Sequence, residues 1–86
     1  MRVLIIATVT RMRDGEWRSA AQIPQFVLDE MTSLRRAVDV ARRILDPHSE
    51  ALSVSIGAVE EGSANYLGAT FTRDSKSGEA VAKYEE

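Results

Sequence analysis

The chain has 86 residues, a length that corresponds to one domain, and a formal net charge of −2. This acidic balance argues against a general nucleic-acid binder, because such proteins usually carry a basic surface. The absence of cysteine excludes disulfides and thiolate metal sites, and a hydrophobic fraction of 44% is too high for a disordered chain.

The apolar start of the chain, from Val3 to Val9, is too short to span a bilayer, and no small-residue cleavage site follows it. We therefore expect a cytoplasmic protein. Arginine is far commoner than lysine among the 11 basic residues, which is typical of GC-rich genomes such as those of actinobacteria and their phages.

The N-terminal part predicts a β-hairpin. Val3 to Thr10 is rich in β-branched residues, and Asp14-Gly15 suits the positive φ angles of a type I′ turn. A two-residue turn there predicts four facing pairs: Arg13 with Glu16, Met12 with Trp17, Arg11 with Arg18, and Ile6 with Ile23. One face of the hairpin then carries Leu4, Ile6, Met12, Trp17, Ala21 and Ile23. Since the first strand is apolar on both faces near its start, we expect it to be central in a sheet.

The segment after this hairpin has two interpretations. Pro24 cannot donate to a β-ladder, so it ends the second strand or lies at an edge, and 26–28 could form a short third strand. Thr32 and Ser33 are good N-caps for a helix that Pro47 stops after Asp46. Alternatively, the helix begins near Pro24 and absorbs the third strand. Ile23 would be a poor N-cap for that longer helix, which favours the shorter one.

The second half predicts another hairpin and a tail. Apolar residues at 52, 54, 56 and 58 alternate with Ser and Gly, which is typical of a half-buried strand, and Tyr66 to Thr72 alternates in the same way. Residues 74–78 read as a loop. We expect a single α+β domain over 1–74 and a polar tail over 75–86 that frays or forms one helical turn. The fold class is an α+β two-layer sandwich in the order ββ(β)αββ, with one helix packed on one face of an antiparallel sheet.

No catalytic constellation is evident. His48 is the only histidine and lies in the loop after the helix, where it can interact with the helix carbonyls. No cysteine or second histidine completes a metal site or a nucleophile–base pair. The paired carboxylates Asp29-Glu30, Glu60-Glu61 and Glu85-Glu86 are sequence neighbours whose side chains diverge. We expect a non-enzyme that needs no metal and no cofactor.

Two arginine clusters are candidate binding sites. At the hairpin end, Arg11 facing Arg18 is an unfavourable pair that Glu16 can relieve diagonally. The same end of the hairpin carries Arg13 and Trp17. Arginine and tryptophan are residue types enriched in interface hot spots, although Trp17 could instead cap the core. The helix carries Arg35, Arg36, Arg42 and Arg43 on one broad face around Asp39. That face is either simply solvated or a positive strip for RNA phosphates or an acidic partner.

The succession of Asp14-Gly15-Glu16-Trp17, Ile23-Pro24 and Thr32-Ser33-Leu34, followed by Ala37 and Ala41-Arg42-Arg43-Ile44, resembles the N-terminal domain of HicB-type antitoxins. The resemblance covers about the first half of the chain. It implies a fold partly like a double-stranded-RNA-binding domain or a degraded ribonuclease H, without enzymatic activity. It also implies that the protein masks a small ribonuclease toxin. Too few residues follow Phe71 for the DNA-binding domain that many members carry.

The leading hypothesis is therefore a small non-enzymatic protein-binding module, similar to a HicB antitoxin, that contacts its partner through Arg11, Arg13, Trp17 and Arg18. A second is a phage or host accessory protein that homodimerises or binds a host protein, with the 66–72 strand as an edge that pairs with another chain. A third is an RNA-binding domain that uses the helix arginines and loses affinity steeply with salt.

Overall fold

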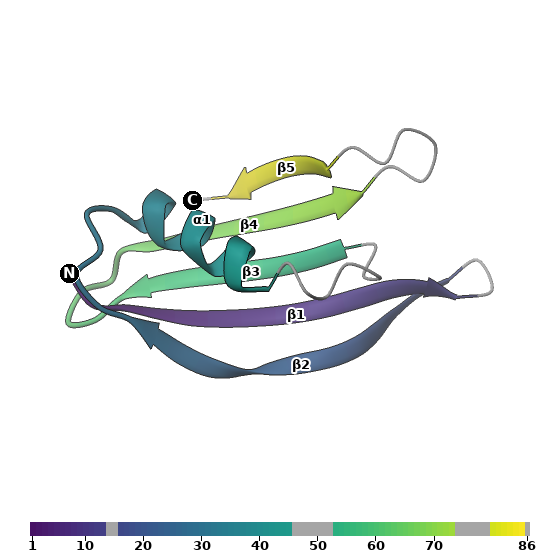
Figure 1. The fold of residues 1–86 in the computed structure, drawn as a ribbon, viewed down its shortest axis with the longest axis horizontal. Coiled ribbons are helices and arrows are strands. Elements are labelled where there is room, and N and C mark those ends of the chain that lie inside the picture. Colours follow the sequence, from purple (N-terminus) through teal and green to yellow (C-terminus); the bar gives the residue numbers. More distant parts are fainter. Residues whose placement is uncertain (14–15, 46–52, 74–79, 86) are drawn as a thin grey trace.

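The computed structural model describes residues 1–13, 16–45, 53–73 and 80–85, with the backbone only at 12, 13, 17, 19–22 and 80. Its elements follow the order β1 (Val3–Arg13), β2 (Glu16–Leu28), α1 (Leu34–Ile44), β3 (Ser53–Glu60), β4 (Tyr66–Arg73) and β5 (Ala80–Glu85). All strand pairings are antiparallel, in the spatial order β2-β1-β3-β4-β5, and α1 packs on one face of the sheet (Figure 1). This arrangement confirms the predicted α+β two-layer fold.

Strand β1 lies between β2 and β3, as its two apolar faces predicted. Its odd-numbered residues from Val3 to Val9 point to α1 and are at most 3% exposed. Val3, Ile5 and Ala7 form one buried cluster with Ile56 and Ala58 of β3 and with the small helix residues Ala37 and Ala41. Alanine on the inner face of α1 lets the helix backbone approach the sheet closely, which produces a dense core in a short chain.

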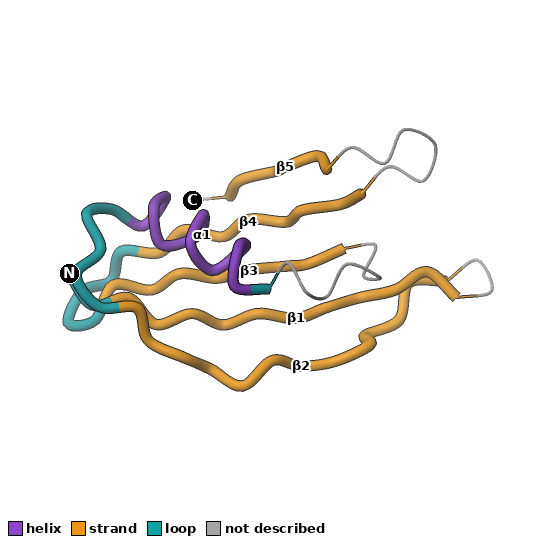
Figure 2. The backbone as a smooth tube through the Cα atoms, viewed as in Figure 1, coloured by secondary structure: helices purple, strands orange, loops and turns teal. Residues whose placement is uncertain are grey.

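The β1–β2 register confirms three of the four predicted pairs, Arg13 with Glu16, Met12 with Trp17 and Arg11 with Arg18, but Ile23 faces Ala7 rather than Ile6. The register shifts twice, between Val9 and Thr10 and between Ile5 and Ala7, and Figure 2 shows the accompanying bends in β2. One extra residue in a strand moves all later side chains to the opposite face. Ile23 therefore packs against the core under α1 and does not share a face with Leu4 and Ile6.

Pro24 does not end β2, which continues to Leu28. Because β2 is an edge strand and its register shifts next to Pro24, the missing N–H of proline removes no essential ladder bond. Residues 26–28 are thus the end of β2 and not a separate third strand. The alternative helix that begins near Pro24 is likewise wrong, since those residues are extended.

Helix α1 begins directly after Ser33, in agreement with the shorter of the two predicted helices. The Ser33 side chain is the N-cap: its Oγ accepts a hydrogen bond of 3.0 Å from the backbone N–H of Arg36. The C-cap is Leu45, and the predicted stop at Asp46 and Pro47 lies outside the described residues.

Loss of this N-cap gives a first testable effect. Ser33→Ala removes the Oγ acceptor, and we expect the free energy of unfolding to fall by about 1 kcal/mol. Thr32→Ala is the matched control, because the Thr32 side chain takes part in no hydrogen bond within the described part of the chain. Urea unfolding followed by circular dichroism measures both. Equal stability of the two variants would contradict the assigned cap.

The C-terminal segment corrects the predicted frayed tail and the domain limit at residue 74. Residues 80–85 form β5, which pairs with β4 from Gly68 to Arg73. The Tyr84 ring packs edge-on against the Phe71 ring, with centroids 6.1 Å apart. Consequently the 66–72 strand is internal and offers no free edge; the edges of the sheet are β2 and β5.

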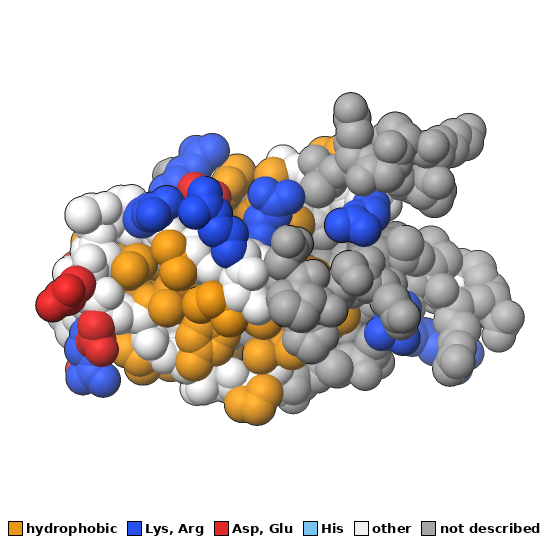
Figure 3. Space-filling view, in the orientation of Figure 1, with side chains coloured by type: hydrophobic (Ala, Val, Ile, Leu, Met, Phe, Trp, Pro, Cys, Tyr) orange, Lys and Arg blue, Asp and Glu red, His pale blue; other side chains and the backbone are white. Residues whose placement is uncertain are grey.

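The helix does not cover the whole of its face. It contacts β1, β3 and β4, whereas Ile23, Phe26 and Leu28 of β2 stay partly buried. In Figure 3 hydrophobic side chains are visible on this face beside α1. No helix in the described ranges is long and apolar enough to cross a membrane.

Candidate functional site

The face of the sheet opposite α1, which we name the open face, is covered by no helix in the described part of the chain (Figure 1). Residues directly opposite each other on neighbouring strands share a face, so the registers define rows that cross the sheet. The first row is entirely apolar and crosses four strands: Val27, Leu4, Val59 and Tyr66. We name it the apolar row. Val27 is 39% exposed and Tyr66 51%, while Leu4 and Val59 are partly buried.

The rows that follow change from apolar to polar. The second consists of Ile6, Gly57, Gly68 and Glu85; the third of Thr8, Ser55, Thr70 and Lys83; the fourth of Thr10, Ser53, Thr72 and Val81. An antiparallel sheet with one wet face normally turns polar side chains to water. The third row obeys this rule, and so does the fourth row apart from the exposed Val81, but the apolar row and Ile6 do not. The exposed apolar end of the open face is therefore the feature that calls for a functional explanation.

Tyr66 lies over the pair formed by Gly57 and Gly68, which we name the glycine pair. A Cβ atom added to Gly68 would stand 2.6 Å from the phenol oxygen of Tyr66, and one added to Gly57 would stand 3.3 Å from its Cε2. The glycines thus leave the space in which the ring rests against the backbone of β3 and β4. Because the side chain remains half exposed, its outer surface is available for contact.

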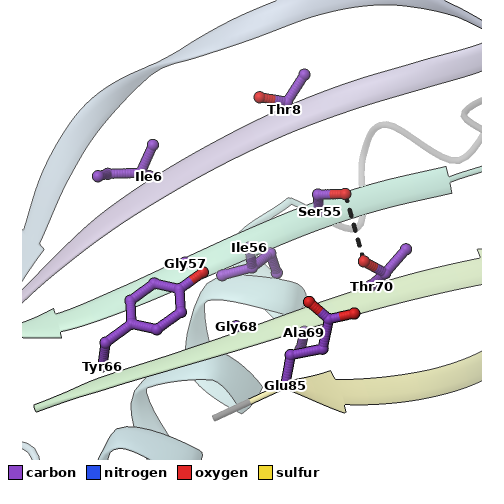
Figure 4. A pocket seen from close by; sticks show the side chains of 10 residues that line it. All are labelled: Ile6, Thr8, Ser55, Ile56, Gly57, Tyr66, Gly68, Ala69, Thr70 and Glu85. Carbon is purple, nitrogen blue, oxygen red and sulfur yellow. Dashed lines mark hydrogen bonds between the residues drawn. The ribbon is translucent and has the colours of Figure 1, made fainter.

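A shallow hollow of about 340 Å³ adjoins this ring (Figure 4). Its sides come from Ile6 on β1 and Glu85 on β5. Beyond the glycine pair it ends at Ser55 and Thr70, whose hydroxyl oxygens lie 3.5 Å apart. The hollow combines an aromatic ring, an aliphatic wall, two hydroxyls and one carboxylate.

The contact between Tyr66 and the glycine pair gives a second testable effect. Gly68→Ala pushes the phenol end of Tyr66 off the sheet, since the new methyl group cannot stand 2.6 Å from the phenol oxygen. We expect large changes in the Tyr66 ring proton shifts and a stability change below about 1 kcal/mol, because the side chain can rotate away. In Gly57→Ala, with a closest approach of 3.3 Å, the ring should move less. Unchanged ring shifts in Gly68→Ala would refute this placement.

The arginines predicted at the hairpin end lie on an arm that projects beyond the sheet. Strand β1 pairs with β3 only as far as Thr10, so 11–13 and 16–18 form a two-stranded extension. Arg11 faces Arg18 as predicted. Glu16 binds Arg18 along its own strand at 3.4 Å, not diagonally, and because both side chains are well exposed this ion pair adds little stability.

The backbones of Arg13 and Trp17 belong to the same arm, opposite Glu16 and Met12. The side chains of Arg13 and Trp17 lie outside the described residues. The fold thus gathers the four predicted partner-binding residues at one end of the molecule. Their role in binding stays a prediction.

The four helix arginines do not form one uniform strip. The guanidinium of Arg35 lies 4.0 Å from the centroid of the Tyr84 ring, and that of Arg42 lies 5.0 Å from the centroid of Phe71. Such contacts are worth about 0.5–1 kcal/mol each at exposed sites. All four helix arginines are exposed, and Figure 3 shows basic side chains gathered over α1. Two of the four thus cover the β4–β5 side of the core.

Three acidic side chains near the start of the chain and the β3–β4 connection are engaged in separate surface contacts. Glu60 accepts a hydrogen bond of 2.8 Å from the side-chain amide of Asn65, whereas Glu61 and Asp29 flank Arg2 at 3.3 and 3.0 Å. The predicted divergence of Glu60 and Glu61 is confirmed by these different partners. No group of three His, Cys, Asp or Glu that could hold a metal ion occurs within the described ranges, and His48 lies outside them.

Sequence reasoning did not find the open face. The alternation of Leu4 and Ile6 was visible, and so was that of Tyr66 and Gly68. These residues form rows because β1 pairs with β3, although α1 lies between the two strands in the sequence. No local sequence pattern predicts that pairing. Once that pairing is known, the alternation of residues in the sequence is sufficient to predict the exposed apolar row.

No protein-family model, no curated protein and no solved structure matches the chain.

Proposed function

We propose that this chain is a small non-enzymatic protein-binding module that docks on a protein partner through the apolar end of its open face. The observation that carries the proposal is the apolar row, which crosses four strands with Tyr66 and Val27 well exposed. Burying such a surface against a partner gains about 25 cal/mol for each Å² removed from water. Tyrosine is also among the residue types enriched in interface hot spots.

The arm with Arg11, Arg13, Trp17 and Arg18 extends from the opposite end of the sheet and provides a second contact region in this proposal. The HicB-type resemblance suggests a small ribonuclease toxin as the partner, which the module would neutralise by covering it. RNA binding has less support, because Arg35 and Arg42 are already stacked on Tyr84 and Phe71.

Affinity capture with matched variants tests the proposal. The tagged chain is incubated with nuclease-treated lysate of its source cells, and any captured protein is purified and rebound quantitatively. We expect Tyr66→Asp to weaken binding at least tenfold, because it places a charge in the apolar row. Val81→Asp is the control: Val81 is 60% exposed on the same face but lies in the fourth row, so its variant should bind like the wild type.

Two outcomes would contradict the proposal. One is equal binding by Tyr66→Asp and Val81→Asp. The other is a partner whose binding is abolished by Arg18→Glu on the arm but unaffected by Tyr66→Asp. Light scattering of the purified chain identifies the case in which the captured protein is a second copy.

A further inference from the structure

We propose that the hollow beside Tyr66 receives an arginine side chain of the protein partner, with its guanidinium between the Tyr66 ring and the Glu85 carboxylate. This inference deepens the proposed function and rests on it. It assigns a chemical identity to the partner residue that faces the centre of the open face.

The geometry brings the two recognising groups to the same place. Gly68 is paired with Glu85 on β5, and neighbouring strands lie about 4.8 Å apart. The phenol end of Tyr66 occupies the position where a Gly68 side chain would begin. The Tyr66 ring and the Glu85 side chain therefore both lie next to the same backbone position, that of Gly68. Figure 4 shows the Glu85 side chain reaching from β5 toward Thr70, across the hollow from Ile6.

The charges favour a cation in this hollow. Within the described ranges no ion pair engages the Glu85 carboxylate. A cation in the hollow is attracted by two groups. The Glu85 carboxylate attracts it through its negative charge, and the exposed face of the Tyr66 ring attracts it through the ring quadrupole. The same carboxylate disfavours anionic groups such as phosphate.

The polar lining favours arginine over lysine. A guanidinium is planar and carries five N–H donors, so it can stack on Tyr66 and bond to Glu85 at the same time. The hydroxyls of Ser55 and Thr70, at the far end of the hollow, are further acceptors. The methylene stem of the arginine can lie against Ile6, which is 38% exposed. A lysine ammonium is more strongly hydrated and gains less from the ring.

A titration with a small probe tests the inference without the partner. Nα-acetyl-arginine methylamide is added to the ¹⁵N-labelled chain, and Nα-acetyl-citrulline methylamide, which has the same shape without the charge, serves as the neutral control. We expect saturable shifts of the Gly57, Gly68 and Glu85 amides with the arginine probe alone. Glu85→Gln and Tyr66→Leu should each weaken binding about threefold, as for exposed ion pairs and cation–π contacts. Lys83→Gln, on the same strand and face, should bind no less tightly.

Equal shifts with the citrulline probe, shifts confined to the arm or α1, or no shifts at all would overturn the inference. The result is separable from the proposed function. If the arginine probe fails while Tyr66→Asp still abolishes partner capture, the open face binds its partner without an arginine in the hollow. If the probe binds but Tyr66→Asp has no effect on capture, the proposed function fails.

Discussion

Ile56→Ala is expected to lower the free energy of unfolding by about 2–4 kcal/mol. Ile56 is 2% exposed and lies in β3 between Ala7 of β1 and Ala69 of β4, beneath α1. Its truncation leaves a cavity that neighbours as small as alanine cannot fill. Because domains of this size have only a modest net stability, the variant should be partly unfolded at 37 °C. Urea unfolding monitored by circular dichroism gives the difference.

The matched control for this prediction is Ile6→Ala, which removes the same side-chain atoms from the open face. Ile6 is 38% exposed, so we expect a loss of no more than about 1 kcal/mol. A cost for Ile6→Ala as large as that for Ile56→Ala would mean that the open face is covered in solution. Light scattering would then establish whether a second copy of the chain covers it.

Removal of β5 is expected to have the second large effect. A chain that ends at Arg73 lacks the ladder between β4 and β5 and loses Tyr84, which packs on Phe71 and lies beneath the Arg35 guanidinium. We expect the truncated chain to lose cooperative thermal unfolding, since Phe71 becomes exposed and β4 becomes a bare edge. Differential scanning calorimetry measures the transition.

The point variant Tyr84→Ala separates the ring from the strand. We expect it to retain a cooperative transition and to lose about 2–3 kcal/mol, less than a fully buried aromatic would, because Tyr84 is only partly buried. If the chain that ends at Arg73 melts at the same temperature as the full chain, residues 80–85 contribute nothing to the fold. That result would restore the frayed tail that the sequence predicted.

Local signals in the sequence predicted the elements they act on. The capping serine at 33 located the start of α1, and Asp14-Gly15 placed the hairpin with its register as far as Arg11 and Arg18. Alternation located β3 and β4. In each case the determining interaction spans only a few residues, as a cap, a tight turn or a strand with one buried face.

The features that the sequence did not reveal depend on distant partners. The register shifts between β1 and β2 leave no signal in the composition of the sequence. They nevertheless place Ile23 on the opposite face of the sheet from the one predicted. Strand β5 is short, and it is stabilised by its pairing with β4 and by the contacts of Tyr84 with Phe71 and Arg35. The apolar row can be recognised only when the order of the strands in the sheet is known. The hollow can be recognised only when the glycine pair and Glu85 are known to be neighbours. Arg35 and Arg42 are exposed, as predicted for a solvated helix face, but their contacts with aromatic rings were not evident because the rings come from β5 and β4.

The central claim is that the apolar end of the open face is where a protein partner binds. Amide hydrogen exchange of the chain, alone and in complex with the protein it captures, tests this most directly. We expect slower exchange on binding around Leu4, Val59 and Tyr66, with α1 unchanged. Protection confined to α1, or to the arm around Arg11 and Arg18, with no change at these three positions, would contradict the claim and place the binding surface elsewhere.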